Sequence, residues 1–173
     1  MALRISVVIL TCDRAEMLGG CLRALGEQER PPDEIVVVDN GSNDEATALI
    51  ATLADALPVR RIPGIPKDRW NGAAASRNLG VREATGDWIA FTDDDCLPTA
   101  DWLRRIAAHA EADRADAIGG ITEDSGTLRF PWWWHEELNW APGLSVPGMK
   151  TKHPGSLHYA QTANMAVRRQ VLL

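Results

Sequence analysis

The sequence has few cysteines and no long apolar segment, which are the features that form disulfides in extracellular proteins and cross the bilayer in membrane proteins. Its three cysteines, Cys12, Cys21 and Cys96, are odd in number and include no C-x-x-C pair, which argues against a disulfide framework or a zinc cluster. No apolar stretch approaches the roughly 20 residues that cross a bilayer, and the run in MALRISVVILTCDR is too short for a secretory signal. We therefore expect reduced thiols, no transmembrane segment and a cytoplasmic location, either free or at the cytoplasmic face of the membrane.

Positive charge is also scarce, because 18 Lys and Arg residues stand against 24 Asp and Glu residues, for a net charge of −6. This balance disfavours nonspecific binding to nucleic acid or to an anionic membrane surface. We expect no nucleic-acid partner. The 173 residues, of which 45% are hydrophobic, suffice for one globular domain with a substantial core.

Short apolar runs alternate with helical patterns through the first two thirds of the chain. Continuous β-prone runs such as Ile5 to Leu10 are typical of parallel strands that are buried on both faces. Asp13 and Glu16 resemble a capping box at the start of the first helix. The alternation predicts an α/β fold with a mostly parallel sheet flanked by helices. Predicted strands cover residues 5–10, 34–38, 59–62, 88–92 and 117–121. The first predicted helix starts near Asp13 and has its apolar residues between positions 17 and 25, and the other predicted helices cover residues 45–54, 73–84 and 100–112.

The regular alternation stops after residue 122, and we divide the chain there. Residues 1–122 form the predicted core, and residues 123–173 form a second segment of the same domain. This segment begins with a stretch rich in Trp and Pro, and residues 158–167 have mixed strand character.

Three polar clusters follow predicted strands directly. They are Thr11–Arg14, Asp39–Ser42 and Asp93–Asp95. Ligands of open parallel sheets bind outside the carboxyl ends of the strands. We therefore expect one edge of the sheet to gather the three clusters into a binding site.

The acidic triplet Asp93–Asp95 raises a problem of charge. Neighbouring carboxylates raise each other's affinity for protons unless positive charge lies between them. Mg²⁺ or Mn²⁺ would supply that charge, because both prefer oxygen ligands and commonly bind one or two carboxylates together with substrate phosphates. The alternative is that the triplet only caps the next helix, although Thr99 is nearer to its predicted start.

The segments ISVVILTCDR, IVVVDNGSND and NGAAASRNLGVREATGDWIAFTDDD, at residues 5–14, 35–44 and 71–95, resemble in order the motifs of family 2 glycosyltransferases. The resemblance implies a GT-A fold, which is a Rossmann-like sheet flanked by helices. It also implies a transferase, usually inverting, that uses a nucleotide-sugar donor. In this family a D-x-D motif holds a divalent metal, Mn²⁺ or Mg²⁺, against the diphosphate of the donor.

The resemblance further implies roles for the residues that match these motifs. Thr11 lies in the loop that holds the base, Asp39 contacts the base or the ribose, and Arg77 lies beside the nucleotide. From residue type alone, two alternatives remain: Asp39 as an ordinary turn or N-cap residue, and Arg77 as a solvated helix charge or the partner of a carboxylate. The implied nucleotide-binding set is Thr11, Asp13, Arg14, Asp39, Arg77, Asp93 and Asp94, and the implied metal ligands are Asp93 and Asp95.

Four positions depart from the family pattern. Leu10, Cys12 and Asp13 stand where the family usually has Pro, an aromatic residue and Asn, and Asn40 replaces a second acidic residue. These positions shape the base pocket, so they put the preferred base in doubt. The expected donor is a UDP- or dTDP-sugar.

The later segment QTANMAVRR resembles the family sequence N-x-A-x-R-R, which precedes the acceptor-side helix. It implies that Asn164, Arg168 and Arg169 face the acceptor, a saccharide or a lipid-linked one, or the leaving diphosphate. A polar strand edge with solvated arginines is the alternative.

The tryptophan cluster supports three interpretations. Trp132, Trp133 and Trp134 could contact the acceptor, form a subunit or membrane-surface contact, or simply pack. In the family a later acidic motif supplies the general base. No such motif occurs before Leu173, so we expect the base beyond this residue.

These observations favour a metal-dependent glycosyltransferase that moves a sugar from a nucleotide sugar to an acceptor hydroxyl. Because the base motif is absent, a noncatalytic nucleotide-sugar or glycan binding module is the alternative. A sugar-1-phosphate nucleotidyltransferase ranks lower, since the loop Thr11–Arg14 lacks the glycines that typically open its phosphate site.

Overall fold

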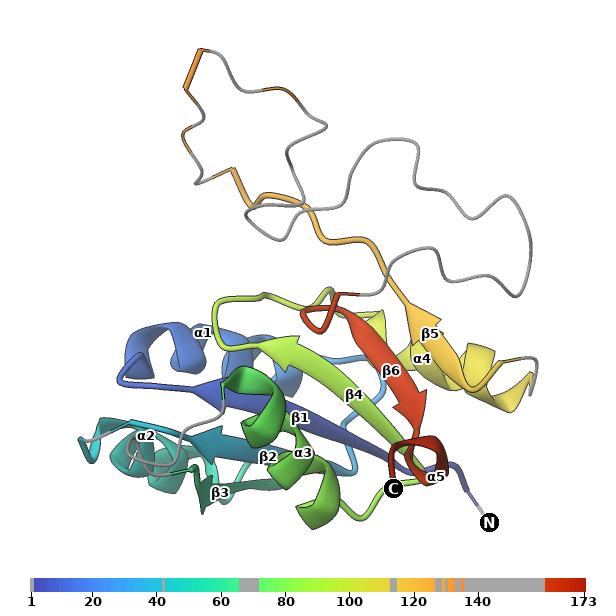
Figure 1. Ribbon diagram of the computed structural model, residues 1–173, viewed down its shortest axis with the longest axis horizontal. Helices are drawn as coiled ribbons and strands as arrows, with labels where there is room; N and C mark the ends of the chain where they lie inside the picture. Colours follow the sequence, from blue (N-terminus) through green and yellow to red (C-terminus); the bar gives the residue numbers. More distant parts are fainter. Residues whose placement is uncertain are drawn as a thin grey trace.

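The protein is an open, twisted sheet with helices packed against it (Figure 1). The computed structural model describes residues 2–41, 43–65, 72–112, 115–126, 129, 131–132, 135 and 161–173. Across these ranges, no helix combines the length and the apolar character needed to cross a membrane.

The sheet has six strands in the order β3-β2-β1-β4-β6-β5. Strands β1 to β4 are parallel, and β6 runs antiparallel to both of its neighbours. This confirms the predicted α/β fold with a mostly parallel sheet. The strands are β1 (Ile5–Thr11), β2 (Glu34–Asp39), β3 (Val59–Pro63), β4 (Trp88–Asp93), β5 (Ala117–Gly119) and β6 (Met165–Arg168), and the helices are α1 (Ala15–Gly26), α2 (Glu45–Leu53), α3 (Ala73–Glu83), α4 (Trp102–Glu111) and α5 (Arg169–Leu172).

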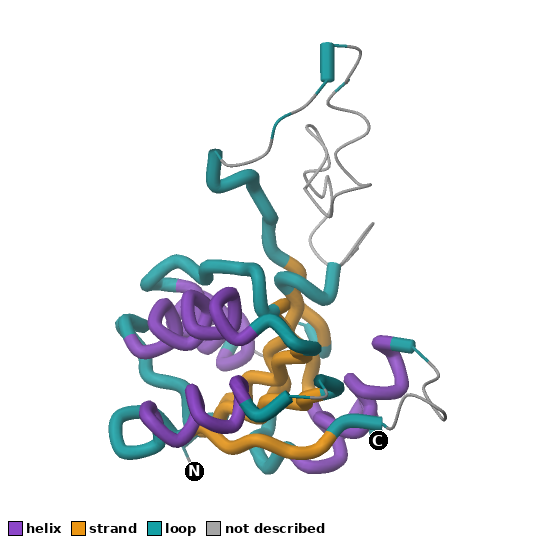
Figure 2. The backbone as a smooth tube through the Cα atoms, turned by 90° about the vertical axis from the view of Figure 1, so that its left-hand side faces the viewer, coloured by secondary structure: helices purple, strands orange, loops and turns teal. Residues whose placement is uncertain are grey.

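Helices lie on either side of the sheet (Figure 2). Both faces of the central strands are therefore buried, which explains why their sequences are continuous apolar runs. Ile5 and Ile9 of β1 belong to the larger core cluster, with side chains of α1, α2 and α4. Val8 faces the other way and packs in a second cluster with Val81 of α3. The central strands therefore have no solvent-facing side.

The start of α1 differs from the prediction. Asp13 and Glu16 do not form a capping box, because the N-cap residue is Arg14 and no side chain caps the helix. Asp13 has a φ of 53°, and its carboxylate accepts a hydrogen bond of 3.3 Å from the backbone N–H of Asn43. Asp13 thus links the loop after β1 to the loop after β2.

The second segment of the chain contributes to the sheet. Its strand β6 lies between β4 and β5, so the sheet extends across the division that we placed at residue 122. The strand predicted over residues 117–121 ends at Gly119.

The strand order reverses between β1 and β4. From β1 the chain crosses to β2 and β3 on one side, and it then returns to β4 on the other side of β1. Such a switch point opens a crevice at the carboxyl ends of the two strands, where ligands of α/β proteins bind. The site described next lies at this edge.

Candidate functional site

The carboxyl ends of β1, β2 and β4 bring the three predicted clusters to one edge, because the strands are parallel and adjacent. In the sheet register Thr11 pairs with Asp39, and Leu10 pairs with Asp93. The backbone N–H of Asn40 donates to the carbonyl of Thr11 at 2.9 Å. The predicted convergence of these residues is therefore present.

The middle residue of the acidic triplet is its buried member. Asp94 is 3% exposed, and its Oδ2 accepts a 2.9 Å hydrogen bond from the Thr11 hydroxyl. Its Oδ1 lies 3.0 Å from Nη1 of Arg14. Burial raises the pKa of Asp94 above its ordinary value, while the Thr11 hydrogen bond and the Arg14 charge oppose that rise. Asp94 thus ties the end of β4 to the loop after β1.

Arginines hold the two outer carboxylates. Nη2 of Arg14 lies 2.7 Å from Oδ2 of Asp95, and Nη2 of Arg77 lies 2.9 Å from Oδ1 of Asp93. The Asp93 and Asp95 side chains remain 36% and 49% exposed. Two guanidinium groups therefore offset the charge of the triplet. The alternative that Arg77 is the partner of a carboxylate is present, whereas the pairing of Arg14 was not expected from the sequence.

The triplet does not cap the next helix. Helix α4 begins at Trp102, after its N-cap residue Asp101, and the hydroxyl of Thr99 donates to Asp101 at 2.8 Å. The capping alternative is therefore wrong, because a separate loop lies between the triplet and the helix.

Asp39 is buried beside a cation that sequence reasoning missed. Its side chain is 1% exposed, and its Oδ2 lies 2.8 Å from Nε of Arg61 on β3. Its Oδ1 accepts from the backbone N–H of Gly41 at 2.8 Å. Each carboxylate oxygen can accept more than one hydrogen bond, so Asp39 keeps capacity for a ligand. The run Arg60-Arg61 in a predicted strand was the available signal.

Asn40, one of the departures from the family pattern, organises the neighbouring loops. Its Oδ1 accepts from the backbone N–H of Ile65 at 3.1 Å and from the hydroxyl of Ser76 at 2.9 Å. Ser76 precedes Arg77 on α3. Asn40 therefore helps to set the position of the helix that carries this arginine.

The donor set at this edge suits a hard divalent cation. Within the residues that the structure describes, no three His, Cys, Asp or Glu side chains come together as a metal site. Two partly exposed carboxylates, Asp93 and Asp95, flank Asp94 at the end of β4. One or two carboxylates completed by substrate phosphates is a common way to bind Mg²⁺ or Mn²⁺, so these residues fit such an ion.

Asn164 forms hydrogen bonds that connect elements of the fold. Its Oδ1 accepts from the indole N–H of Trp102 at 2.8 Å, and its Nδ2 donates to the carbonyl of Ile121 at 2.8 Å. Its backbone carbonyl accepts from Gly120 at 3.0 Å. The side chain that we expected to face the acceptor or diphosphate instead joins α4 to the end of β5.

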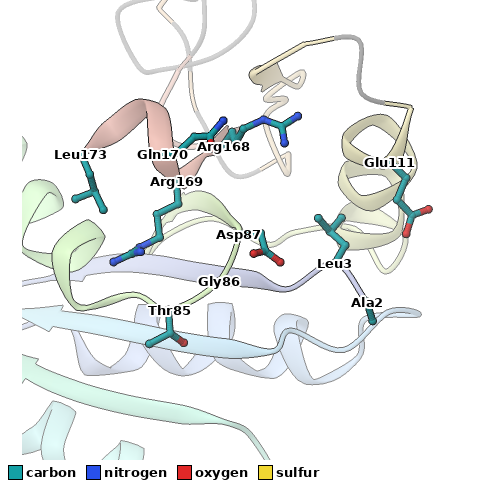
Figure 3. Close-up of a pocket in the computed structure, with 10 residues that line it drawn as sticks. All are labelled: Ala2, Leu3, Thr85, Gly86, Asp87, Glu111, Arg168, Arg169, Gln170 and Leu173. Carbon is teal, nitrogen blue, oxygen red and sulfur yellow. The ribbon is translucent and has the colours of Figure 1, made fainter.

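Arg168 and Arg169 lie away from the acidic triplet. Arg168 pairs with Trp88 in the antiparallel register, so it lies roughly 16 Å along β4 from Asp93, at about 3.3 Å per residue. It contacts Asp116 at 2.8 Å and stacks over the Trp88 ring. Figure 3 shows both arginines at a hollow of about 880 Å³ beside Asp87, near the amino end of β4. The structure does not bring them to the predicted site.

The tryptophan cluster falls largely outside the described residues. Trp132 is described and is 95% exposed. Trp133 and Trp134 lie outside the described part of the chain, so the three interpretations of the cluster stay predictions.

Comparison with protein families and curated proteins places this site in a known context. The model of Glycosyl transferase family 2 matches residues 6–173. Glycosyltransferase AglE of Haloferax volcanii is 34% identical over 124 residues, which are 69% of this chain and 39% of AglE. Succinoglycan biosynthesis protein ExoO of Rhizobium meliloti is 32% identical over 147 residues, 83% of this chain and 40% of ExoO. The chain thus spans about two fifths of the length of these relatives.

Solved structures share the fold. S. aureus TarS matches 98% of this chain and 48% of its own, with a TM-score of 0.71 and 18% identity, and a similar TarS structure contains UDP-GlcNAc. The mannosyltransferase PcManGT of Pyrobaculum calidifontis, in complex with GDP-Man and Mn²⁺, matches 71% of this chain and 36% of its own, with a TM-score of 0.62 and 26% identity. These likenesses confirm the predicted GT-A fold class.

Proposed function

Because this chain belongs to glycosyl transferase family 2, we propose that it forms the donor-binding part of a glycosyltransferase that acts on an acceptor hydroxyl. The observation that carries the proposal is the convergence of Thr11, Asp39, Arg77 and the triplet Asp93–Asp95 at one edge of the sheet. Four separate stretches of chain supply these groups, and the edge lies at the switch point that suits a nucleotide.

The nucleotide would lie across the ends of β1 and β2. Asp39 has the chemistry to accept from an imide N–H or a ribose hydroxyl. A Cβ on Gly41 would come within 2.7 Å of the Asp13 carboxylate and 2.8 Å of the Asp39 carboxylate, so the glycine lets both carboxylates lie against this loop. We propose a UDP- or dTDP-sugar as donor. The GDP-Man complex of the mannosyltransferase adds a guanine nucleotide as a donor to be tested.

The diphosphate would lie over the end of β4. Asp93 and Asp95 would hold Mn²⁺ or Mg²⁺ there, and the ion would supply positive charge against the leaving diphosphate. Arg77 offers forked N–H donors suited to phosphate oxygens and is already placed at this edge by its contact with Asp93. Fixed positive groups that face the developing charge are the largest expected contribution to catalysis.

The proposed reaction is a single displacement with inversion. The acceptor oxygen forms a bond to the anomeric carbon, the bond from that carbon to the diphosphate oxygen breaks, and the acceptor proton passes to a general base. Among the residues that the structure describes, we assign none as this general base. A noncatalytic binding module would bind donor in the same way, and turnover of donor with acceptor, or slow donor hydrolysis, separates the two functions.

The test is calorimetric titration of UDP, dTDP and GDP in Mn²⁺ with two matched variants. Arg77→Gln and Arg168→Gln each remove one arginine that pairs with one aspartate, at 2.9 Å and 2.8 Å. We expect Arg77→Gln to weaken binding of the best nucleotide by about tenfold or more, because a hydrogen bond between charged groups contributes about 1.5–3 kcal/mol, and we expect Arg168→Gln to leave that binding unchanged. Equal weakening by both variants, or no binding of any nucleotide to the wild type, contradicts the proposal.

A further inference from the structure

Arg14 makes two carboxylate contacts of different kinds. Its Nη1 contacts Asp94, which is 3% exposed, and its Nη2 contacts Asp95, which is 49% exposed. The Met17 sulfur also lies 2.9 Å from Nη2. One guanidinium therefore joins a buried carboxylate and a solvent-facing carboxylate at the edge of the sheet.

The two contacts differ in how easily they can be given up. Breaking the contact with Asp94 would leave a buried carboxylate without its cation, which is costly. Breaking the contact with Asp95 costs little, because water can solvate an exposed carboxylate and exposed ion pairs contribute little to stability. Arg14 is thus anchored at Nη1 and exchangeable at Nη2.

Asp95 is also one of the carboxylates that fit a divalent cation. A guanidinium group and a metal ion compete for the same oxygen atoms, since both are attracted to the negative charge. Once Asp95 is engaged elsewhere, the Nη2 group of Arg14 keeps the Met17 sulfur, which is a weak acceptor, and has no charged one. A phosphate oxygen is a suitable replacement, because the planar guanidinium fork matches phosphate geometry.

We propose that Arg14 is a donor-positioning residue that exchanges partners when the site fills. Without metal and donor, its Nη2 group holds Asp95. With both bound, Nη1 stays on Asp94 while Nη2 turns from Asp95 to the diphosphate of the nucleotide. The inference rests on the proposed function, and it adds that Asp94 is the fixed anchor about which Arg14 turns.

The exchange makes Arg14 a competitor of the metal in the absence of nucleotide. Removing Arg14 should free Asp95 and strengthen metal binding. It should also weaken nucleotide binding when metal is bound, because the phosphate contact that Arg14 makes in that state is lost, and it should leave nucleotide binding without metal nearly unchanged. A purely structural arginine would have neither effect in a protein that still folds.

The test uses Arg14→Gln combined with Asp94→Asn. The double variant removes one positive and one negative charge, so the net charge of −6 is unchanged, and it leaves no buried charge unpaired. The amide oxygen that the second substitution introduces can still accept from Thr11, which protects the fold. The control pair Arg104→Gln with Glu29→Gln removes an exposed ion pair of 2.5 Å on the outside of α4.

Mn²⁺ alone is titrated first. We expect the double variant to bind Mn²⁺ about two- to fivefold more tightly than wild type, the range set by exposed ion pairs, and the control pair to match wild type. UDP and GDP are then titrated in saturating Mn²⁺, where the double variant should bind the preferred nucleotide at least about threefold more weakly than wild type, and in EDTA, where the two should bind it about equally. Unchanged or weaker Mn²⁺ binding, or unchanged nucleotide binding in saturating Mn²⁺, overturns the exchange.

Asp95→Asn separates this inference from the proposed function. If Asp95→Asn does not weaken Mn²⁺ binding relative to the wild type, the proposed metal site is wrong. If Asp95→Asn weakens it and the double variant does not strengthen it, the metal site stands and the exchange is overturned.

Discussion

Three adjacent aspartates at the end of β4 have three different environments. Asp94 is buried between Thr11 and Arg14, whereas Asp93 and Asp95 are partly exposed and each contacts one arginine. Asp93 is the last residue of β4, and Asp94 and Asp95 follow it in a turn. A row of like charges is tolerated because no two members share one environment.

Glu34 is the most connected carboxylate at the opposite, amino edge of the sheet. Its Oε2 accepts from the Ser6 hydroxyl at 2.5 Å and from the Thr85 N–H at 2.8 Å, and its Oε1 accepts from Arg60 at 3.1 Å. Burial raises the pKa of Glu34, but these hydrogen bonds outweigh burial and hold the pKa below its ordinary value of 4.5. The ionised side chain therefore joins β1, β2, β3 and the loop before β4.

Glu34→Gln should destabilise the protein by about 1–3 kcal/mol at neutral pH, because the buried Ser6 hydroxyl loses its charged acceptor. Since the folded pKa is lowered, the stability from ionised Glu34 is present above pH 4.5 and is lost as the pH falls through the folded pKa. The difference in the free energy of unfolding between wild type and variant, measured by urea denaturation, should therefore shrink as the pH falls below 4.5. Glu83→Gln, at an exposed carboxylate 3.6 Å from Arg60, is the control. A difference that does not change with pH would contradict this role.

At the scale of elements, α3 lies unusually close to the sheet. A Cβ on Gly80 would come within 2.5 Å of Val8 Cγ1 and 3.1 Å of Val38 Cγ2. Both valines are buried and stiff at χ1, so the helix approaches β1 and β2 only because residue 80 has no side chain. Arg77 lies one turn earlier on the same helix, and the glycine thereby sets how far the guanidinium is from Asp93.

Gly80→Ala should displace α3 and destabilise the protein by about 1–3 kcal/mol, as overpacking does. It should also weaken nucleotide binding in Mn²⁺, because Arg77 moves with the helix. Gly20→Ala on α1 is the matched control, since its Cβ would meet only Leu97 at an ordinary 3.5 Å. Calorimetry and urea denaturation measure both effects. Wild-type stability and affinity in Gly80→Ala would show that α3 does not depend on this close approach.

Helix α4 is fixed by a residue from another loop. The Gln28 side chain accepts from the backbone N–H of Leu103 at 3.0 Å and donates to the carbonyl of Thr99 at 2.8 Å. Gln28 is 7% exposed. The loop between Asp95 and α4 is therefore held at its far end by the chain that follows α1.

For the whole molecule, the order of elements could be predicted because each strand and helix carries a local signal. The parallel strands are buried on both faces, so they appear as apolar runs, and their carboxyl ends meet at one edge in any doubly wound sheet. The meeting of these strand ends predicted that Thr11, Asp39 and Asp93 lie together, and the register of the sheet agrees.

Two features could not be predicted: the direction of a short strand in the sheet, and the ion pairs between side chains from distant segments. A short strand such as β6 carries no signal for its direction, and its antiparallel pairing sends Arg168 to the amino end of β4 rather than to the site. The contacts of Arg61 with Asp39 and of Arg14 with Asp94 and Asp95 join different elements. Neither composition nor spacing encodes such pairings.

The central claim, that this edge binds a nucleotide diphosphate together with a metal, is tested most directly by Asp95→Asn. The preferred nucleotide diphosphate is titrated in Mn²⁺ and in EDTA into wild type, Asp95→Asn and Asp116→Asn, an exposed carboxylate paired with Arg168 at 2.8 Å. If metal and diphosphate complete each other's ligands, their binding is coupled. Asp95→Asn should then bind about tenfold or more weakly in Mn²⁺ and about as well as wild type in EDTA, while Asp116→Asn matches wild type in both. Equal weakening of Asp95→Asn in Mn²⁺ and in EDTA, or none in either, would contradict the account.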